Sequence, residues 1–419
     1  MSFIRRLAPP LLGQPEFRKF WLGQTISVFG DQVTSLALPI VAVLVLGASS
    51  SDMGLLTAAG LLPALLFSLP AGAWLDRVRR RRRLMILADL CRAAAITVVP
   101  IAWVLNVLSM PLIFVMSFVV GTLSVLFMIA WSTLFTAVAT REDYVSASAL
   151  LNGSRSLSSV GGPALGGVLI QFLGAPLALL ADALSFVGSA SFLSRIRAAD
   201  PPLDHEPGTI RQQLTTGMRF IFADPIVRPV LLSAATLNFF NFCFAALFIL
   251  FATRDLGVEP GVLGLVLGSG AVGSIVGAVF ASRIGRAIGL GRAYILGLFL
   301  FPGPLILVPL ANGLPMPVIL AMLFASEFLA GMGLMILDIN VGAMNLARIP
   351  QRIRSRVSGS FGFINNGIRP IGATVGGLLG AAIGVRETLL IVSIAQLAGL
   401  LWLIRSPIPS IREMPEPAE

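Results

Sequence analysis

Four charged side chains interrupt long apolar stretches of this 419-residue sequence: Asp31, Arg155, Glu327 and Arg369. Each lies about 10 to 13 residues from the end of its stretch, which in a helix corresponds to a depth of roughly 15–20 Å. A charge at the centre of a membrane-spanning helix costs about 2.5–3.5 kcal/mol if it faces lipid, or about 10–14 kcal/mol for all four. We therefore expect these side chains to face the protein interior and to form, with Asn241 at a similar depth, a central polar belt.

A carboxylate at this depth can bind and release a proton, so Asp31 and Glu327 are candidates for proton coupling. Two acids and two bases also allow neutral pairing, for example of Asp31 with Arg155, and ion pairs that only fix the helices remain the alternative. Asp89 and Arg92 are three residues apart on one helical face. For these two residues we expect a local structural pair.

Aromatic side chains are the candidates for an apolar substrate cavity. Phe240 and Phe244 belong to the run Phe239, Phe240, Phe242 and Phe244 in one apolar stretch, and Trp131 lies in another. Such residues suit the walls of a site for lipophilic molecules. Ordinary helix packing is the alternative role for all of these residues.

The composition places these residues in a membrane protein. Hydrophobic residues make up 56% of the chain and charged residues only 12%, about half of the share in a soluble domain. This excludes a soluble enzyme, a disordered protein and a nucleic-acid-binding domain, and the formal charge of +10 is explained by membrane topology. Cys91 and Cys243 both lie in apolar runs, which predicts neither a disulfide framework nor a metal site. We expect no metal and no cofactor.

A helix needs about 20 mainly apolar residues to cross the hydrocarbon core of a bilayer. Twelve stretches meet this requirement, so the predicted fold class is an all-α membrane protein with twelve transmembrane helices. The first stretch is longer than the apolar region of a cleavable signal peptide, about 7–15 residues, and is expected to remain. The predicted spans are 18–46, 53–75, 84–106, 110–138, 145–172, 175–195, 228–253, 260–282, 290–311, 316–346, 357–383 and 387–405.

Arginine is unevenly distributed among the connections between these spans. The loop after the second span holds six arginines between positions 77 and 83, whereas the alternate loops hold only Arg254 and Arg386. Cytoplasmic loops carry the excess of positive charge. Both termini are therefore expected in the cytoplasm, with the chain in the inner cell membrane.

A long polar stretch divides the predicted spans into six and six. We expect an N-terminal half at 1–196, a cytoplasmic linker at 197–225, a C-terminal half at 226–405 and a cytoplasmic tail at 406–419. Within the linker, apolar residues at helical spacing predict an amphipathic helix on the inner membrane surface.

The two halves resemble each other in sequence. Asn152-Gly-Ser-Arg155 recurs as Asn366-Gly-Ile-Arg369, and at the same offset of 214 positions Gly162 and Gly166 fall on Gly376 and Gly380. Equivalent spans run in the same direction, so this is a parallel repeat. Two such halves imply pseudo-two-fold symmetry and a substrate site near the middle of the membrane.

The loop after the second span resembles the signature Gly-x-Leu-Ala-Asp-Arg-x-Gly-Arg-Lys of the major facilitator superfamily. The matching residues are Gly72, Asp76, Arg77, Arg80 and Arg81. The resemblance implies alternating access, with Asp76 closing the cytoplasmic side near the positive dipole end of the eleventh span, a contact worth about 0.3–2 kcal/mol. Anchoring of the arginines near anionic lipid remains an alternative for them.

Further motifs resemble the exporters of this superfamily. Gly162-Pro163-Ala-Leu-Gly166-Gly167 resembles the core of a motif associated with export, although close helix packing also explains its small residues. Three more motifs resemble the drug:proton antiporter branch that contains macrolide and enterobactin exporters. They are Trp21-Leu-Gly-Gln24 with Gly30-Asp31-Gln32, Ala88-Asp89-x-x-Arg92, and Asp182-Ala-Leu-Ser-Phe186.

The resemblance covers essentially the whole chain and implies proton-coupled export of an amphipathic organic compound, such as a drug, a macrolide or a siderophore-like molecule. In this family the first span lines the cavity, which makes Asp31 the leading proton carrier and Glu327 the second. The expected partners are a small-molecule substrate, protons and the lipid bilayer, and the expected state is a monomer without nucleic acid.

Other classes of membrane protein fit less well. An ATP-driven pump needs a phosphate-binding loop with a lysine, and Lys19, the only lysine, has no such context. A polytopic membrane enzyme would need clustered catalytic residues, and the only histidine, His205, lies in the polar linker. A channel or scramblase needs neither two similar halves nor a gate motif. A proton-coupled importer of the same fold is the main alternative to the exporter.

Overall fold

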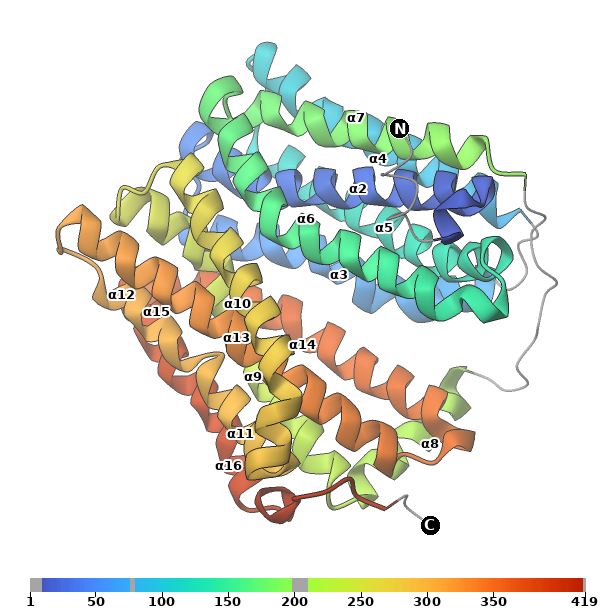
Figure 1. Cartoon of the computed structure of the whole chain (residues 1–419). Coiled ribbons are helices and arrows are strands. Elements are labelled where there is room, and N and C mark those ends of the chain that lie inside the picture. Colours follow the sequence, from blue (N-terminus) through green and yellow to red (C-terminus); the bar gives the residue numbers. More distant parts are fainter. Residues whose placement is uncertain (1–9, 76–79, 198–209, 417–419) are drawn as a thin grey trace. The chain divides into compact units, whose positions relative to one another are not determined.

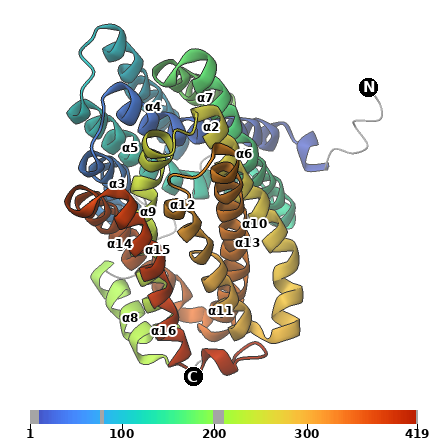
Figure 2. The same ribbon diagram turned by 90° about the vertical axis from the view of Figure 1, so that its left-hand side faces the viewer.

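The computed structural model describes residues 10–75, 80–197 and 210–416. Within these ranges the regular elements are all helical (Figures 1 and 2), and eleven helices are long and apolar enough to cross a membrane. A twelfth long helix, α14 (Arg354–Ile383), is not among these eleven. It carries Arg369, one of the four charges that interrupt the apolar stretches of the sequence. The predicted all-α membrane fold is therefore confirmed.

The chain divides into two compact units. The first consists of Met1–Val41 and Pro63–Glu206, and the second consists of Ala42–Leu62 and Pro207–Glu419. Helix α3 (Ser50–Leu75) is continuous across this division, with Pro63 inside it. Its first half therefore belongs to the second unit and its second half to the first.

The first unit is organised around two helices that pack on each other, α2 and α7. Helix α2 also packs against α6, helix α7 against α4, and α4 against α5. Phe17, Phe20 and Met85 are fully buried in the core of this unit. Its long helices, besides the second half of α3, are α2 (Pro15–Ile40), α4 (Arg81–Val104), α5 (Met110–Val138), α6 (Tyr144–Leu173) and α7 (Ala175–Ser194).

In the second unit, α10 packs against α13, α13 against α11, and α9 against α14. The amphipathic helix α8 lies on α14 and α9, and its residue Ile221 is buried in a small core with Val357. The helices are α8 (Ile210–Ala223), α9 (Val227–Leu250), α10 (Pro260–Ile288), α11 (Leu290–Leu300), α12 (Leu307–Leu310), α13 (Met316–Arg348), α14, α15 (Val385–Ala395) and α16 (Gly399–Ile404).

Short helical turns join or extend these helices. They are η1 (Pro10–Gly13), η2 (Val41–Val45), η3 (Arg141–Asp143), η4 (Phe251–Asp255), η5 (Gly303–Ile306), η6 (Gln351–Ile353), η7 (Gln396–Ala398) and η8 (Ile408–Ser410). Two predicted spans, 290–311 and 387–405, are interrupted by such turns. In the first, Pro302 and Pro304 lie at the break, where proline removes backbone donors that a continuous helix needs.

The two units repeat the same sequence of elements at an offset of 210 residues. Helix α6 spans Tyr144–Leu173 and α14 spans Arg354–Ile383, so both bounds differ by 210. The π-helical turns η2 and η4 obey the same offset, as do the left-handed glycines Gly47 and Gly257. The internal repeat predicted from the sequence is thus present.

The offset of 214 predicted for the motifs in α6 and α14 was wrong by four residues, whereas the offset of 210 that aligns Asp31 with Asn241 agrees with the structure. Packing shows the true register: Gly166 faces Val33 on α2, and Gly376 faces Cys243 on α9, a pair of contacts related by 210. Four residues are close to one helical turn of about 3.6 residues, so both registers place these glycines on the same helix face. Arg155 is therefore equivalent to Asn365 rather than to Arg369.

Glycines allow the long helices to approach one another closely. On α6, a Cβ atom at Gly162 would lie 2.7 Å from Cγ of Gln32, and Pro163, Gly166 and Gly167 are buried beside it. On α10, a Cβ atom at Gly273 would overlap the carbonyl oxygen of Phe328. Small residues at such crossings are typical of helix packing in membranes.

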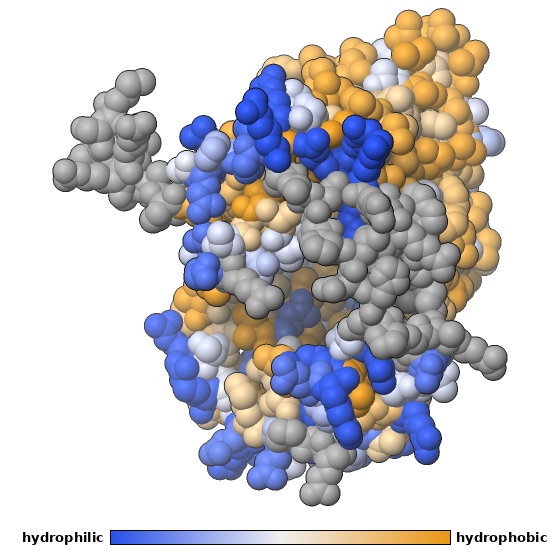
Figure 3. Space-filling model, turned by 90° about the vertical axis from the view of Figure 1, so that its right-hand side faces the viewer, coloured by the Kyte–Doolittle hydropathy of each residue, from blue (hydrophilic) through white to orange (hydrophobic). Residues whose placement is uncertain are grey.

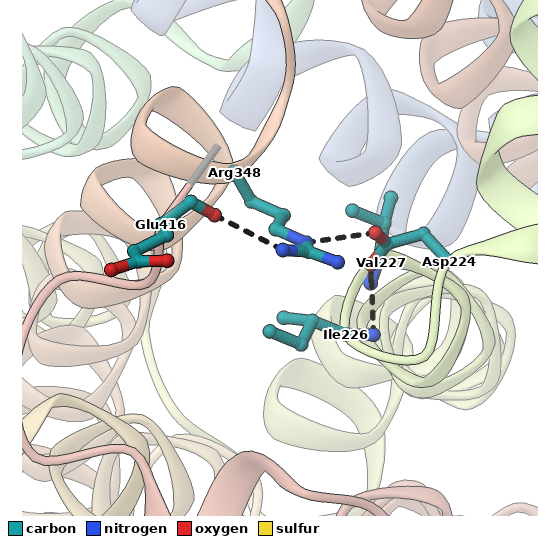
Figure 4. A network of polar contacts seen from close by, with 5 residues as sticks. All are labelled: Asp224, Ile226, Val227, Arg348 and Glu416. Carbon is teal, nitrogen blue, oxygen red and sulfur yellow. Dashed lines mark hydrogen bonds and ion pairs between the residues drawn. The ribbon is translucent and has the colours of Figure 1, made fainter. Parts of the chain in front are cut away.

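In the second unit, a polar network joins the start of α9, the end of α13 and the C-terminal tail (Figure 4). The carboxylate of Asp224 accepts hydrogen bonds from the backbone N–H groups of Ile226 and Val227, both at 2.9 Å, and so satisfies donors at the start of α9. Arg348, at the end of α13, donates to Oδ2 of Asp224 at 2.8 Å and to the carbonyl of Glu416 at 3.0 Å. The tail is thereby attached to the ends of two long helices.

The helix flanks expose large apolar side chains, as expected for surfaces that face lipid. Phe172, Leu184 and Met128 are 83%, 71% and 70% exposed. In the upper part of Figure 3, hydrophilic side chains gather beside a broad surface of apolar ones. This distribution agrees with a multi-pass membrane protein.

The glycine contacts predict opposite effects for two substitutions in α14. A Cβ atom at Gly376 would lie 2.9 Å from the backbone carbon of Cys243, whereas Gly362 has open space around this position. We expect Gly376→Ala to lower the stability by about 1–3 kcal/mol because the α9 backbone has to shift. Gly362→Ala should leave it unchanged or raise it by up to about 1 kcal/mol. Apparent melting temperatures of the purified variants in detergent check this, and equal melting temperatures would contradict the packing.

Candidate functional site

Three sequence motifs that are far apart in the chain meet inside the first unit. Asp31 comes from α2, Asp89 and Arg92 from α4, and Asp182 from α7. The charges of Asp89 and Arg92 act on Asp31, and those of Asp31 and Arg92 act on Asp182. We call these four residues the acidic cluster. Ionisable groups gathered in the interior of membrane spans are typical of ion or substrate pathways.

Arg92 is held firmly at the centre of this cluster. Its guanidinium forms an ion pair with Asp89, as expected from their spacing, and the two residues are 3% and 0% exposed. The group lies close to two aromatic rings, 4.4 Å from the centroid of Phe127 and 4.3 Å from that of Phe186. Cation–π contacts with both rings stabilise the charge in this buried environment.

Asp182 is 1% exposed and receives hydrogen bonds from two hydroxyl groups. Thr34 on α2 donates to Oδ2, and Ser185, one turn along α7, donates to Oδ1 at 3.0 Å. Oδ1 also lies where a Cβ atom of residue 30 would be, so Gly30 lets the carboxylate reach the backbone next to Asp31. The side chain of Asp31 itself is exposed.

Arg155 lies on the exposed side of α6, with its guanidinium 5.2 Å from the ring centroid of Trp131 on α5. Trp131 stacks on Phe135, with 5.6 Å between the ring centroids. Among the described residues, the charges found to act on Asp31 come from the acidic cluster and not from Arg155. The expected pairing of Asp31 with Arg155 is therefore absent from this structure.

The second unit contains a cavity of about 440 Å³ enclosed by α9, α11, α13 and α14. One side is polar: Nε of Arg369 donates to Oδ1 of Asn238 at 3.1 Å, and Asn238 donates to Oδ1 of Asn365 at 3.2 Å. The charge of Asp338 on α13 acts on Arg369. Other walls are apolar, so the cavity can accept a molecule with both polar and apolar parts. Its polar lining residues are Asn238, Asn241, Tyr294, Asp338, Asn345, Asn365 and Arg369.

Glu327 lies apart from this cavity, at the crossing of α13 with α10. A Cβ atom at Gly270 would be 3.2 Å from Oε2 of Glu327, so the carboxylate packs against the α10 backbone. Within the described ranges, no hydrogen bond or ion pair to the Glu327 carboxylate is found. The Glu327 side chain is thus half-buried and packs on a helix backbone, with no counter-charge among the described residues.

The phenylalanines of the predicted run have different surroundings. Phe242 lines the cavity of the second unit, and its ring lies 5.4 Å from the guanidinium of Arg369. Phe244 is 3% exposed and stacks on Phe248. Phe240 makes an edge contact with Phe239.

The predicted cytoplasmic gate motif is only partly described. Asp76 and Arg77 lie outside the described residues, and Gly72 lies within α3. Arg80 is exposed just before α4, whereas Arg81 is buried and donates a hydrogen bond to Thr133 on α5. At least one arginine of this loop therefore joins two helices.

Sequence reasoning missed most of the amide groups that line the cavity. Asn365 carried a usable signal, because it lies four residues before Arg369 and so shares its helix face. Asn238 and Asn345 offered no comparable signal. Within the ranges that the structure describes, no group of three or more His, Cys, Asp or Glu side chains is arranged to hold a metal ion.

Two repeated helical units, with ionisable groups inside apolar spans, define a secondary transporter of the major facilitator type. A family model described as transmembrane secretion effector matches residues 5–418. The chain therefore belongs to this family of the major facilitator superfamily. Members of the superfamily are transporters, which confirms the prediction that the chain is not an enzyme.

Curated relatives extend over the same length. The multidrug efflux pump Tap of Mycolicibacterium fortuitum is 27% identical over 395 residues, which cover 92% of this chain and 93% of that protein. Tap of Mycobacterium tuberculosis is 26% identical over 410 residues, covering 92% and 91%. An uncharacterised transporter of Bacillus subtilis, YfiS, is 26% identical over 405 residues, covering 93% of each chain.

Solved structures share the fold at low sequence identity. The nucleoside transporter NupG has a TM-score of 0.75 at 10% identity, and a bacterial homologue of the iron transporter ferroportin has 0.74 at 18% identity. Each comparison covers 93% of this chain and 98% of the other. At these identities the likeness establishes the fold alone.

The buried ion pair predicts strongly non-additive effects of substitution. Arg92→Met should lower the stability by about 3–5 kcal/mol, because Asp89 is left as an uncompensated buried charge. The double variant Asp89→Asn/Arg92→Met should regain a large part of this loss. Arg80→Met, at an exposed position, is the control and should change stability by less than about 0.5 kcal/mol. Thermal unfolding in detergent gives the comparison, and simple additivity of the two single variants would contradict the pairing.

Proposed function

We propose that the protein is a proton-coupled exporter that moves amphipathic organic compounds out of the cell by alternating access. The names of its relatives, multidrug efflux pumps, support the direction and the substrate class. The observation that carries the proton coupling is Asp31, the exposed member of the acidic cluster, which lies within an apolar span and near the buried Asp89 and Arg92. Such a group can exchange protons with water and pass a change of charge to the protein interior.

The energetic requirement is modest. One proton that crosses a potential of 100 mV supplies about 2.3 kcal/mol, and a tenfold gradient of a neutral substrate costs about 1.4 kcal/mol. One proton per substrate therefore sustains a gradient of about 40-fold for each 100 mV. Asp31 is the leading carrier in this proposal, and Glu327, which has no counter-charge in the described structure, is the second.

The cavity of the second unit supports an amphipathic substrate. Arg369, Asn238 and Asn365 present hydrogen-bonding groups on one side, while Leu334, Leu337 and Phe361 present apolar surface on others. The proposal assigns substrate contact to Arg369 and Asn241. In the first unit, Arg155 lies over Trp131 and is the polar-belt residue that the proposal assigns to α6.

We further propose that the loop around Gly72, Asp76 and Arg80 forms the cytoplasmic gate of a monomer in the inner membrane. In this proposal both termini and the linker at 197–225 face the cytoplasm. The arginine-rich connections support this orientation. An importer of the same fold would use the same parts, and the direction of transport distinguishes the two.

Substitution of the carrier should uncouple transport without abolishing it. In inverted membrane vesicles energised by a proton gradient, we expect the wild type to accumulate ethidium and a macrolide antibiotic. Asp31→Asn should reduce this accumulation at least about tenfold, because the side chain no longer changes charge. Exchange of substrate between equilibrated compartments should remain within about twofold of the wild type.

Glu142→Gln, at an exposed carboxylate in η3, is the matched control and should accumulate substrate normally. If Asp31→Asn still accumulates substrate at the normal rate, the role of carrier passes to Glu327 and is tested with Glu327→Gln. Accumulation by right-side-out vesicles would indicate an importer. Indifference of the wild type to the gradient would refute proton coupling altogether.

The orientation is tested by labelling single cysteines in a variant that lacks Cys91 and Cys243. We expect a cysteine at Asp204, in the linker, to be protected from a membrane-impermeant maleimide in intact cells and to react in inverted vesicles. A cysteine at Asn312, in the exposed loop between α12 and α13, should show the opposite pattern. Labelling of position 204 in intact cells would overturn the proposed topology.

A further inference from the structure

The third motif of the acidic cluster has no role in the function proposed above. Asp182, Ser185 and Phe186 all come from one turn of α7, and each contacts the cluster: Ser185 bonds to Asp182, and the Phe186 ring lies against Arg92. None of these contacts is repeated in the second unit. At an offset of 210, Asp89, Arg92 and Asp182 correspond to Phe299, Pro302 and Val392.

The charges of the cluster do not balance. Three carboxylates face one guanidinium, and Arg92 pairs directly with Asp89. Even there, Oδ2 of Asp89 is buried and has no hydrogen-bond partner. The charge of Arg92 also acts on Asp31 and on Asp182, but one guanidinium cannot balance three carboxylates. Two neighbouring carboxylates repel each other when both are ionised, and one proton held by either relieves the repulsion.

The geometry connects the two carboxylates through α2. Oδ1 of Asp182 lies against Gly30, the residue before Asp31, and Oδ2 accepts the hydroxyl of Thr34, one turn after Asp31. Any side chain at position 30 would overlap Asp182 and Ser185. Glycine at this position is thus required for the approach of the α7 carboxylate to the α2 backbone.

We infer that Asp182 is the second acid of a proton site shared with Asp31. This inference rests on the proposed proton coupling and names the partner of its carrier. Asp31 is the exposed member, which exchanges the proton with water, and Asp182 is the buried member, which holds the proton between α2 and α7. Transfer from the carboxylic acid of Asp31 to the carboxylate of Asp182 leaves the charge of the pair unchanged. Binding and release change that charge by one.

Sharing also gives the proton a mechanical effect. The ionised Asp182 accepts hydrogen bonds from Thr34 and Ser185 through its two carboxylate oxygens. When Asp182 is protonated, one of these oxygens carries a hydrogen, which makes it a donor and a weaker acceptor. The contact between α2 and α7, the main contact of α2 in the first unit, therefore differs between the two states. Asp89 and Arg92 on α4 are the other charged groups that act on the pair.

The test does not depend on knowledge of the substrate. Dicyclohexylcarbodiimide reacts with protonated carboxyl groups in apolar surroundings, and mass spectrometry of peptides locates the adduct. In the purified full-length wild type at neutral pH, we expect adducts on Asp31 and on Asp182 in different molecules, with at most one per molecule. Glu142→Gln should give the same pattern as the wild type.

Each carboxylate should lose reactivity when the other is removed. In Asp182→Asn, labelling of Asp31 at a given neutral pH should fall about tenfold, because the neighbouring negative charge that favours its protonation is gone. In Asp31→Asn, labelling of Asp182 should fall similarly. We expect this variant to fold, because position 31 is exposed. Asp182→Glu should restore labelling of Asp31 toward the wild-type level.

Labelling of Asp31 that stays within twofold of the wild type in Asp182→Asn would overturn the shared site, and so would a complete lack of adduct on Asp182 in both the wild type and Asp31→Asn. Protection by sodium ions without any dependence on pH would indicate a sodium site instead. Failure of proton coupling itself is a separate result. It would appear as wild-type transport that ignores the proton gradient, whatever the labelling shows.

Discussion

The cost of placing charge among apolar membrane spans is the constraint on which this structure depends. Each ionisable group within a span has to find partners inside the protein, because lipid offers none. Arg92 meets the requirement with one carboxylate and two aromatic rings. Arg369 meets it with an amide, an aromatic ring and the charge of Asp338. Glu327 packs against a neighbouring helix and, among the residues that the structure describes, has no counter-charge.

Close helix packing and buried polarity are linked in this molecule. Gly30 admits the carboxylate of Asp182, and Gly270 admits that of Glu327 against the neighbouring backbone. The same residue type that lets two helices touch therefore also creates the space in which an acid can lie. A stripe of small residues in such a span thus positions acidic side chains as well as helices. The sequence alone does not separate these two roles, because the same glycine can serve both.

Much of the architecture could be predicted because it follows from local composition. Apolar length located the spans, and spacing located the pair of Asp89 with Arg92. The register of the repeat could not be fixed, since a shift of four residues nearly preserves the face of a helix. The contact of Arg155 with Trp131 could not be predicted, because it depends on which helix packs beside α6 in the tertiary structure. The amides of Asn238 and Asn345 could be recognised only from the cavity that four helices line together.

The matched turns after α2 and α9 bear on the ancestry of the chain. Both turns are π-helical, both lead to a left-handed glycine, and both contain the same backbone hydrogen bond, from Ala48 to Ala42 and from Val258 to Ala252, at 2.9 Å. Such an irregular detail, kept in two copies, is the mark of a duplicated six-helix gene whose backbone was retained. Side chains then diverged: one copy carries Asp31 and its acidic neighbours, and the other carries Asn241 among amides. One backbone irregularity thus frames two different side-chain settings, carboxylates in the first unit and amides in the second.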